Sequence, residues 1–379
     1  MAGPRPGHPH AMTDDAVRPF RIDVPQAEVD ELRDRLARTR WPAPQQQDGD
    51  RGIAVDVVRE LADHWRTEWD WREHETALNA CDQVETTVDG TRLHALHVRS
   101  PEADAPVLVL LHGWPGSVVE FTRVVAPLAE TMHVVVPSLP GYGFSGPTPD
   151  GGWTTQRMAR AIAELLARLG HDRYVVHGGD WGARVARDLG AQDTAHVAGV
   201  HVTMTMGLDV DEPADDAERA AAERGAHYAR ELSGYFRTQS TRPLSLAPAF
   251  TDSPAGLLAW IAERFRDWTD PASDALGALR DQVLADVAVY WFTGTAPSSS
   301  QLYWETRNAE PGTWSREVPT GVCVLPHDLA RPVRRAVEAA VDLVHWTELP
   351  AGGHFPAMEV PDLLVADLRT FVARVTAGD

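Results

Sequence analysis

The apolar positions near the start of the chain repeat with the spacing of amphipathic helices. Between residues 26 and 39, apolar side chains return every three or four positions among Glu, Asp and Arg, and a similar pattern returns between residues 53 and 65. Two runs with strand character follow at residues 84–88 and 92–98, joined by Asp89-Gly90, a typical hairpin dipeptide. This part of the chain is therefore predicted to form helices and a β-hairpin.

After Pro106 the pattern changes to short apolar runs bounded by Gly or Pro, with helix-like stretches between them. Continuous apolar strands that alternate with helices are typical of a parallel sheet covered on both faces, so the predicted fold class is α/β. The predicted strands cover residues 107–111, 133–136, 174–177, 198–204, 321–325 and 343–349, and a closing helix covers residues 361–375.

Between about residues 207 and 312 the strand pattern disappears, and the sequence is helical and rich in Trp and Tyr. Ser253-Pro254 supplies a helix N-cap followed by a proline at the first helical position. We interpret this stretch as an inserted helical cap. The predicted organisation is an N-terminal extension at 1–104, with a disordered lead at 1–15, the α/β core at 105–206 and 313–379, and the cap at 207–312.

Composition narrows the function classes. The 379 residues include 43% apolar and 24% charged side chains, close to the globular average, and the net charge of −20 disfavours nucleic acid and anionic lipid as partners. Cys81 and Cys323 provide neither a disulfide framework nor a zinc spacing, and no apolar run is long enough for a membrane span. We expect a cytoplasmic protein that uses no metal or organic cofactor.

The strongest chemical motif is a strand that runs into a glycine-flanked turn and then a helix, with Asp180 at its centre. A nucleophile elbow of the α/β-hydrolase fold has this form, because its strained turn needs small residues two positions before and after the nucleophile. Gly178 and Gly182 supply them. An aspartate stands where hydrolases usually carry serine, and the chain has no G-x-S-x-G pentapeptide. The alternative is that Asp180 only caps the helix that follows it.

Two further motifs stand where this fold places the rest of a catalytic site. His112-Gly113-Trp114-Pro115-Gly116 follows the strand at 107–111, in the position of an oxyanion-hole loop, although Trp-Pro-Gly could also be a simple turn. We expect the backbone amides of Trp114 and Trp181 to face the Asp180 carboxylate, and we expect a cis peptide at Trp114-Pro115.

The histidine and the acid of a triad should follow in chain order. His354, in Gly352-Gly353-His354-Phe355 after the last predicted strand, is the candidate base. Asp328 follows the preceding strand and is the candidate acid. Its rival is Glu348, which lies in the final strand, and the alternative for Asp328 is a solvated loop carboxylate.

These motifs together resemble the epoxide hydrolases of the α/β-hydrolase superfamily, in particular the microsomal and juvenile-hormone group and its soluble bacterial relatives. Arg40-Trp41-Pro42 and Asp70-Trp71-Arg72 resemble that group's N-terminal extension. The resemblance implies that two cap tyrosines act as acids, and the motifs around Tyr235 and Tyr303 match. Without it, either would be interpreted as a core tyrosine, as we interpret Tyr228 and Tyr290. One departure is Asp328, where many microsomal members carry glutamate.

The predicted function is the hydrolysis of an apolar or aromatic epoxide to a vicinal diol, through an ester on Asp180. His354, oriented by Asp328, would activate water, while Trp114 and Trp181 would bind the reacting group. By analogy with bacterial relatives, a role in secondary metabolism is one expectation, and a homodimer is compatible with the sequence. The alternatives are a haloalkane dehalogenase and a ligand receptor without catalysis.

Overall fold

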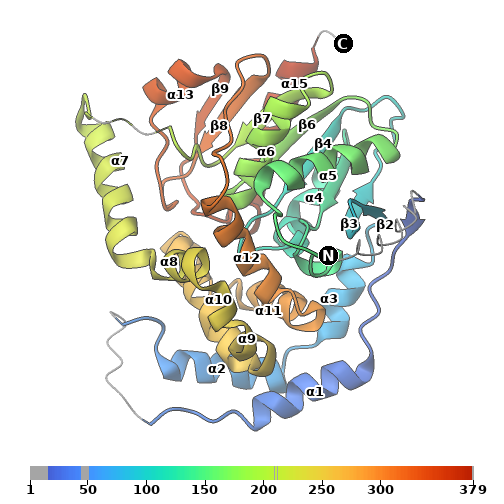
Figure 1. Ribbon diagram of the computed structural model, residues 1–379, viewed down its shortest axis with the longest axis vertical. Helices are drawn as coiled ribbons and strands as arrows, with labels where there is room; N and C mark the ends of the chain where they lie inside the picture. The colour runs from blue at the N-terminus through green and yellow to red at the C-terminus, as the bar shows by residue number, and fades with distance from the viewer. Residues whose placement is uncertain (1–15, 44–50, 209, 211, 378–379) are drawn as a thin grey trace, which may run out of the picture.

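The computed structural model describes residues 16–43, 51–208, 210 and 212–377, so the predicted disordered lead lies outside the described residues. Within them, one sheet of nine strands runs through the upper part of the molecule in the view of Figure 1. The strand order is β1-β2-β3-β5-β4-β6-β7-β8-β9. The pairs from β1 to β5 are antiparallel and those from β5 to β9 are parallel. The strands are β1 (Arg18–Pro19), β2 (Gln83–Val88), β3 (Thr91–Val98), β4 (Val107–Leu111), β5 (His133–Pro137), β6 (Tyr174–Gly178), β7 (Val197–Val202), β8 (Pro319–Val324) and β9 (Asp342–Glu348).

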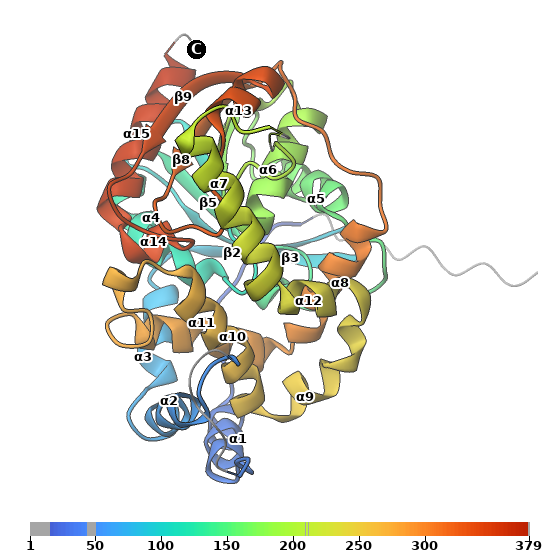
Figure 2. The ribbon, with the colours of Figure 1, turned by 90° about the vertical axis from the view of Figure 1, so that its left-hand side faces the viewer.

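The parallel part of the sheet is the buried centre of the fold. Every residue of β4, β6 and β7 is buried, as continuous apolar runs predict for strands covered on both faces. Figure 2 shows one helical layer on each side. One layer holds α4 (Thr122–Ala129), α14 (Pro356–Glu359) and α15 (Pro361–Thr376), and the other holds α5 (Thr155–Arg168) and α6 (Asp180–Gln192). A short helix, α13 (Arg334–Ala340), precedes β9.

Between β7 and β8 the chain leaves the sheet and forms the helices of the predicted cap. In Figure 1 the first of them, α7, lies to the left of the sheet, and the others lie below it. The boundaries at 207 and 312 stay predictions, but the helical character of the segment is as expected. The helices are α7 (Asp216–His227), α8 (Gly234–Thr241), α9 (Ala247–Asp252), α10 (Pro254–Trp268), α11 (Arg280–Thr293) and α12 (Ala296–Arg307), with a π-helical turn, η3 (Tyr228–Leu232), after α7.

The N-terminal extension packs against this cap. Its helices are α1 (Gln26–Ala37), α2 (Val55–Thr67) and α3 (Trp71–Leu78), and α1 and α2 lie beside α10 at the lower end of the molecule in Figure 1. Arg35 of α1 forms an ion pair with Asp252 at 2.9 Å, and His64 of α2 contacts Asp281 at 2.7 Å. The extension therefore braces the helices that cover the sheet. Within the described residues, no helix is both long and apolar enough to span a bilayer.

Candidate active site

Asp180 lies in the sharp turn where β6 ends and α6 begins. Its φ of 47° places a non-glycine residue in the left-handed region, which is strained. The two flanking glycines make this turn possible. A β-carbon on Gly182 would lie 2.0 Å from the carbonyl oxygen of Leu111, and one on Gly178 would lie 2.3 Å from the backbone of Gly182. The turn presents a buried carboxylate at the carboxyl end of the central strands.

The loop after β4 approaches this carboxylate as the sequence predicts. The backbone N–H of Trp114 donates to Oδ1 of Asp180 at 2.8 Å, and the Trp114-Pro115 peptide is cis, as expected. Gly113 allows the close approach, since a β-carbon there would lie 2.3 Å from the same oxygen. The N–H of Trp181 makes no hydrogen bond to a described residue, so one of the two expected amides contacts the carboxylate in this structure.

His354 lies between two carboxylates. Its Nδ1 is 2.7 Å from Oδ1 of Asp328, and its Nε2 is 3.5 Å from Oδ2 of Asp180. Burial alone would lower the pKa of His354, but the two carboxylates outweigh it and raise the pKa to about 10. The rival acid, Glu348, pairs with Arg331 at 2.7 Å, and among the described residues it is Asp328 that contacts Nδ1 of His354. The imidazole of His354 thus lies between the carboxylates of Asp180 and Asp328, as a catalytic triad requires.

Two tyrosines from the cap face the same carboxylate region. The ring of Trp114 stacks on Tyr235 with 5.2 Å between centroids, and Tyr303 packs edge-on against Trp181 at 4.7 Å. Burial raises the pKa of both phenols well above the ordinary value, so both carry their protons at neutral pH. The Tyr303 hydroxyl has no hydrogen-bond partner among the described residues. It is therefore free to donate to a bound molecule.

A cavity of about 270 Å³ lies beside the Asp180 carboxylate and the two cap tyrosines. Asp180, Tyr235 and Tyr303 line it, together with apolar side chains such as Phe236 and Leu329. A pocket with apolar walls and a few converging polar groups is typical of a small-molecule site. Asp180 and Trp181 from the core and the two tyrosines from the cap therefore share one space, whereas Trp114, Asp328 and His354 do not line it.

The comparisons with known proteins agree with this geometry. Residues 17–121 match the family described as "Epoxide hydrolase N terminus", and residues 106–253 match "alpha/beta hydrolase fold". The chain is 38% identical to a protein of Stigmatella aurantiaca (strain DW4/3-1) that is provisionally named an epoxide hydrolase, over 93% of this chain and 84% of the relative. The chain belongs to the epoxide hydrolase family.

Two solved structures extend this finding to the arrangement in space. The epoxide hydrolase of Aspergillus niger superposes with a TM-score of 0.87 at 30% identity, covering 96% of this chain and 97% of that one. The juvenile hormone epoxide hydrolase of Bombyx mori superposes with a TM-score of 0.87 at 27% identity, covering 96% and 95%. The predicted α/β-hydrolase fold and the predicted family resemblance are both confirmed.

The sequence did not reveal every residue that shapes this epoxide hydrolase site. Tyr228 was expected to be a core tyrosine, and this was wrong: it lines the cavity, and its hydroxyl lies 2.8 Å from that of Tyr235. Tyr290 is a core residue as expected, because it is buried and donates to the carbonyl of Gly116 at 2.8 Å. Whether Tyr228 lies in the core or lines the cavity depends on the position of the π-helical turn η3, and no sequence pattern encodes that position directly.

The loop that carries His354 is held by two carboxylates that the sequence analysis also missed. Glu359 accepts the backbone N–H of Gly353 and of Phe355, each at 2.8 Å. Asp270, from the cap, accepts the N–H of Gly352 at 3.0 Å. Charge-assisted hydrogen bonds to backbone amides are strong, so the loop is fixed from both the core and the cap. A glutamate four residues beyond Phe355, at the end of the short helix α14, was the available signal.

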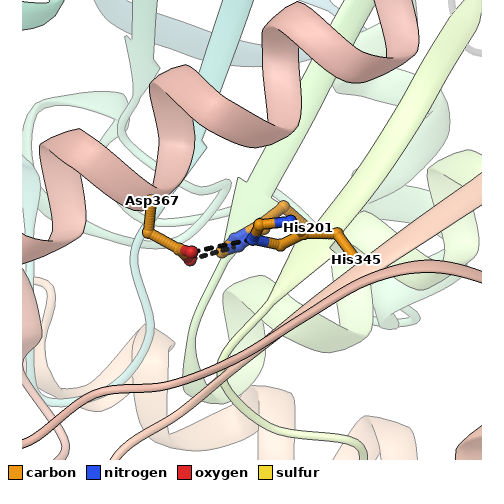
Figure 3. A group of neighbouring side chains, drawn as sticks. All are labelled: His201, His345 and Asp367. Carbon is orange, nitrogen blue, oxygen red and sulfur yellow. Dashed lines mark hydrogen bonds and ion pairs between the residues drawn. The ribbon is translucent and has the colours of Figure 1, made fainter.

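One group of side chains away from the site has the residue types of a metal centre. Figure 3 shows His201 and His345 facing Asp367, and the candidate ligand atoms lie within 4.8 Å of one another. The Nε2 atoms lie 3.0 and 2.7 Å from the two carboxylate oxygens. These are hydrogen-bond lengths, whereas two ligands of a tetrahedral zinc with bonds of about 2.1 Å lie roughly 3.4 Å apart. The group is therefore a hydrogen-bonded link between β7, β9 and α15.

Proposed function

We propose that this protein hydrolyses epoxides in two steps, with Asp180 as the nucleophile. In the first step an oxygen of Asp180 attacks a ring carbon and the bond from that carbon to the epoxide oxygen breaks. An alkoxide is a poor leaving group, so a proton must reach the departing oxygen. Tyr235 and Tyr303 are placed to provide it, because both line the cavity and both keep their protons at neutral pH.

The positive charge of His354 before the reaction provides the proton that the tyrosine needs back after this step. Between Asp180 and Asp328 the imidazole holds an extra proton, which the pKa of about 10 reflects. Ester formation removes the charge of Asp180, so the imidazolium loses a stabilising partner and gives up its proton. That proton replaces the one that the tyrosine donated. The first step therefore leaves a neutral His354, which is the form that a general base requires.

In the second step the neutral His354 takes a proton from water, and the water oxygen attacks the ester carbonyl. The oxyanion that forms is stabilised by the N–H of Trp114, which already contacts Oδ1 of Asp180 at 2.8 Å, and by the N–H of Trp181 as the expected second donor. The acyl C–O bond then breaks, the remaining proton of the attacking water passes to the departing oxygen, and the diol leaves. Asp180 is again a carboxylate and His354 again an imidazolium, so the cycle closes without any other group.

The observation that carries this proposal is that two buried, protonated phenols and the Asp180 carboxylate line one cavity. A haloalkane dehalogenase would need halide-binding groups there, and a receptor would need no aligned base. The cavity volume of about 270 Å³ lies at the small end for ligand sites and favours a compact aryl epoxide.

The test compares three outcomes with one enzyme preparation. The protein is incubated separately with each enantiomer of styrene oxide and with 1-chlorobutane and 1-bromobutane, and diol and halide are both measured. We expect diol from styrene oxide and no halide. Halide release without diol would support the dehalogenase, and saturable binding of styrene oxide without diol would support the receptor. The expected cytoplasmic location, the homodimer and the role in secondary metabolism stay predictions.

A further inference from the structure

Arg184 is a cation in the wall of the candidate active site that the proposed mechanism does not use. It follows Asp180 by one turn of α6, a rise of about 6 Å, and it lines the same cavity. An arginine keeps its charge at any ordinary pH. A positive charge therefore stands beside the position of the substrate.

The contacts of Arg184 include no ion pair with a carboxylate of the described residues. Its Nε donates to the sulfur of Met206 at 2.6 Å, and its guanidinium lies 4.8 Å from the ring centroid of Trp181. A thioether is a weak acceptor and an aromatic face carries no net charge. Burial and, to a smaller extent, the nearby Arg187 lower the pKa of Arg184, and the charges of Asp180 and Asp188 offset only part of this lowering.

Two neighbouring arginines, in contrast, each form an ion pair with a carboxylate. Arg331 lines the same cavity and pairs with Glu348 at 2.7 Å. Arg187, further along α6, pairs with Asp188 at 2.7 Å. Of these three, only Arg184 faces the cavity without an ion pair to a described residue. The Asp180 carboxylate lines the same cavity and attracts Arg184 without contacting it, so the guanidinium can still bind a ligand group directly.

A second cavity extends the positive region. It has a volume of about 620 Å³ and shares Trp181, Arg184, Phe236 and Tyr303 with the first. Arg237 and Arg307 also line it, and no carboxylate is among its lining residues. A cluster of arginines is notable in a chain whose net charge is −20. The local potential thus attracts anions into the side of the site that lies away from Asp180.

We propose that Arg184 binds a carboxylate of the substrate, so that the preferred substrates are epoxides with a carboxylate about one aromatic ring away from the oxirane. This inference rests on the proposed function, because it assigns the substrate class of the same site. The planar guanidinium of Arg184 matches the two oxygens of a carboxylate. The helical turn between Asp180 and Arg184 sets the spacing, since the epoxide carbon must reach Asp180 while the carboxylate reaches Arg184.

The experiment uses two substrates of nearly equal size, 4-(oxiran-2-yl)benzoate and 4-(oxiran-2-yl)benzamide, with diol formation as the readout. The measured quantity is the ratio of kcat/KM for the carboxylate to that for the amide. In the wild-type protein we expect a ratio of about ten or more, the range of hydrogen bonds to a charged group. Because both substrates meet the same protein, a general loss of folded enzyme cancels in the ratio.

The variants assign the effect to one residue. Arg184→Met should reduce the ratio to about one, and Arg184→Lys should restore part of it, because the charge returns without the planar fork. Arg331→Met is the matched control: it removes a cavity-lining cation that Glu348 already neutralises, so the ratio should stay within about threefold of the wild-type value. Arg237→Met tests the outer arginines separately.

The outcomes separate the two claims. Equal kcat/KM for both substrates in the wild-type protein, or a ratio that Arg184→Met leaves unchanged, would overturn the inference while the epoxide hydrolase activity stands. A ratio that falls in Arg237→Met and not in Arg184→Met would overturn the assignment to Arg184. If neither substrate gives a diol while styrene oxide does, the inference is overturned and the epoxide hydrolase activity stands. If styrene oxide is bound and gives no diol either, the proposed function and this inference fall together.

Discussion

Replacement of Asp180 by Asn should lower the pKa of His354. In the structure Nε2 of His354 lies 3.5 Å from Oδ2 of Asp180, and the imidazole has a pKa of about 10. The amide of Asn keeps the shape of the side chain but removes its charge. The variant therefore imitates the ester state, in which the proposed mechanism needs His354 to be neutral.

The expected size follows from the distance. Two unit charges 3.5 Å apart interact by about 1 kcal/mol in water and by about 5 kcal/mol at an effective dielectric constant of about 20. Because 1.36 kcal/mol corresponds to a pKa change of about one, the loss of Asp180 should lower the pKa of His354 by about one to four. The remaining partner, Asp328, should keep it above the value of a buried, unpaired histidine.

Nuclear magnetic resonance can follow the titration with protein labelled in the histidine rings. The resonance of His354 is identified as the one missing from His354→Gln, and intact mass confirms that the introduced amide has not hydrolysed back to a carboxylate in the Asp180→Asn sample. Asp362→Asn, an exposed change in α15, is the control and should leave the pKa of His354 unchanged. An equal or higher pKa in Asp180→Asn would refute the view that the two side chains form a charge pair.

Two further predictions concern the cap and the link between the strands. Tyr235→Phe and Tyr303→Phe should each retain some alkylation activity, because one phenol can still donate, whereas the double variant should lose about a thousandfold or more in single-turnover rate; a fully active double variant would reopen the dehalogenase alternative. Asp367→Asn should destabilise the fold by about 3 kcal/mol in urea titrations at pH 7, because it disrupts the hydrogen bonds from His201 and His345. Burial alone would raise the pKa of Asp367, but those hydrogen bonds outweigh it and hold the pKa below the ordinary value of 3.8. The stability that they contribute is therefore present above that pH. The difference in unfolding free energy between wild type and Asp367→Asn should shrink as the pH falls below about 4. A difference that grows in acid would contradict the assignment.

The fold was largely predictable because its signals are local. The hairpin at Asp89-Gly90 is present, with both residues at positive φ of 51° and 74°. The continuous apolar runs became buried parallel strands. The strand expected at 198–204 ends earlier, at Val202, because the chain turns there and Met204 contributes to the cavity wall instead of the sheet. Hydrophobicity alone cannot distinguish a buried strand residue from an apolar cavity wall.

The residues of the site also differ in how far the sequence could predict them. Asp180, Trp114 and His354 stand on loops that follow strands, so chain order was enough to place them together. Tyr235 and Tyr303 come from the cap, and without the family resemblance nothing local distinguished them from Tyr228. Arg184 was within reach, because a residue four positions after Asp180 on a helix lies on the same face. Its lack of an ion pair, however, depends on long-range packing that the sequence does not display.

The central claim is that Asp180 forms a covalent ester that His354 helps to hydrolyse. The most direct measurement is the intact mass of His354→Gln after mixing with styrene oxide, followed by peptide mapping. The first step needs only Asp180 and the tyrosines, so we predict a mass increase of one substrate, located on the peptide that contains Asp180. Wild-type protein after one turnover in ¹⁸O-water should carry the label in the Asp180 carboxylate, and the first diol should be unlabelled. A fully labelled first diol, with no adduct in His354→Gln, would show that water attacks the epoxide directly and would contradict this account.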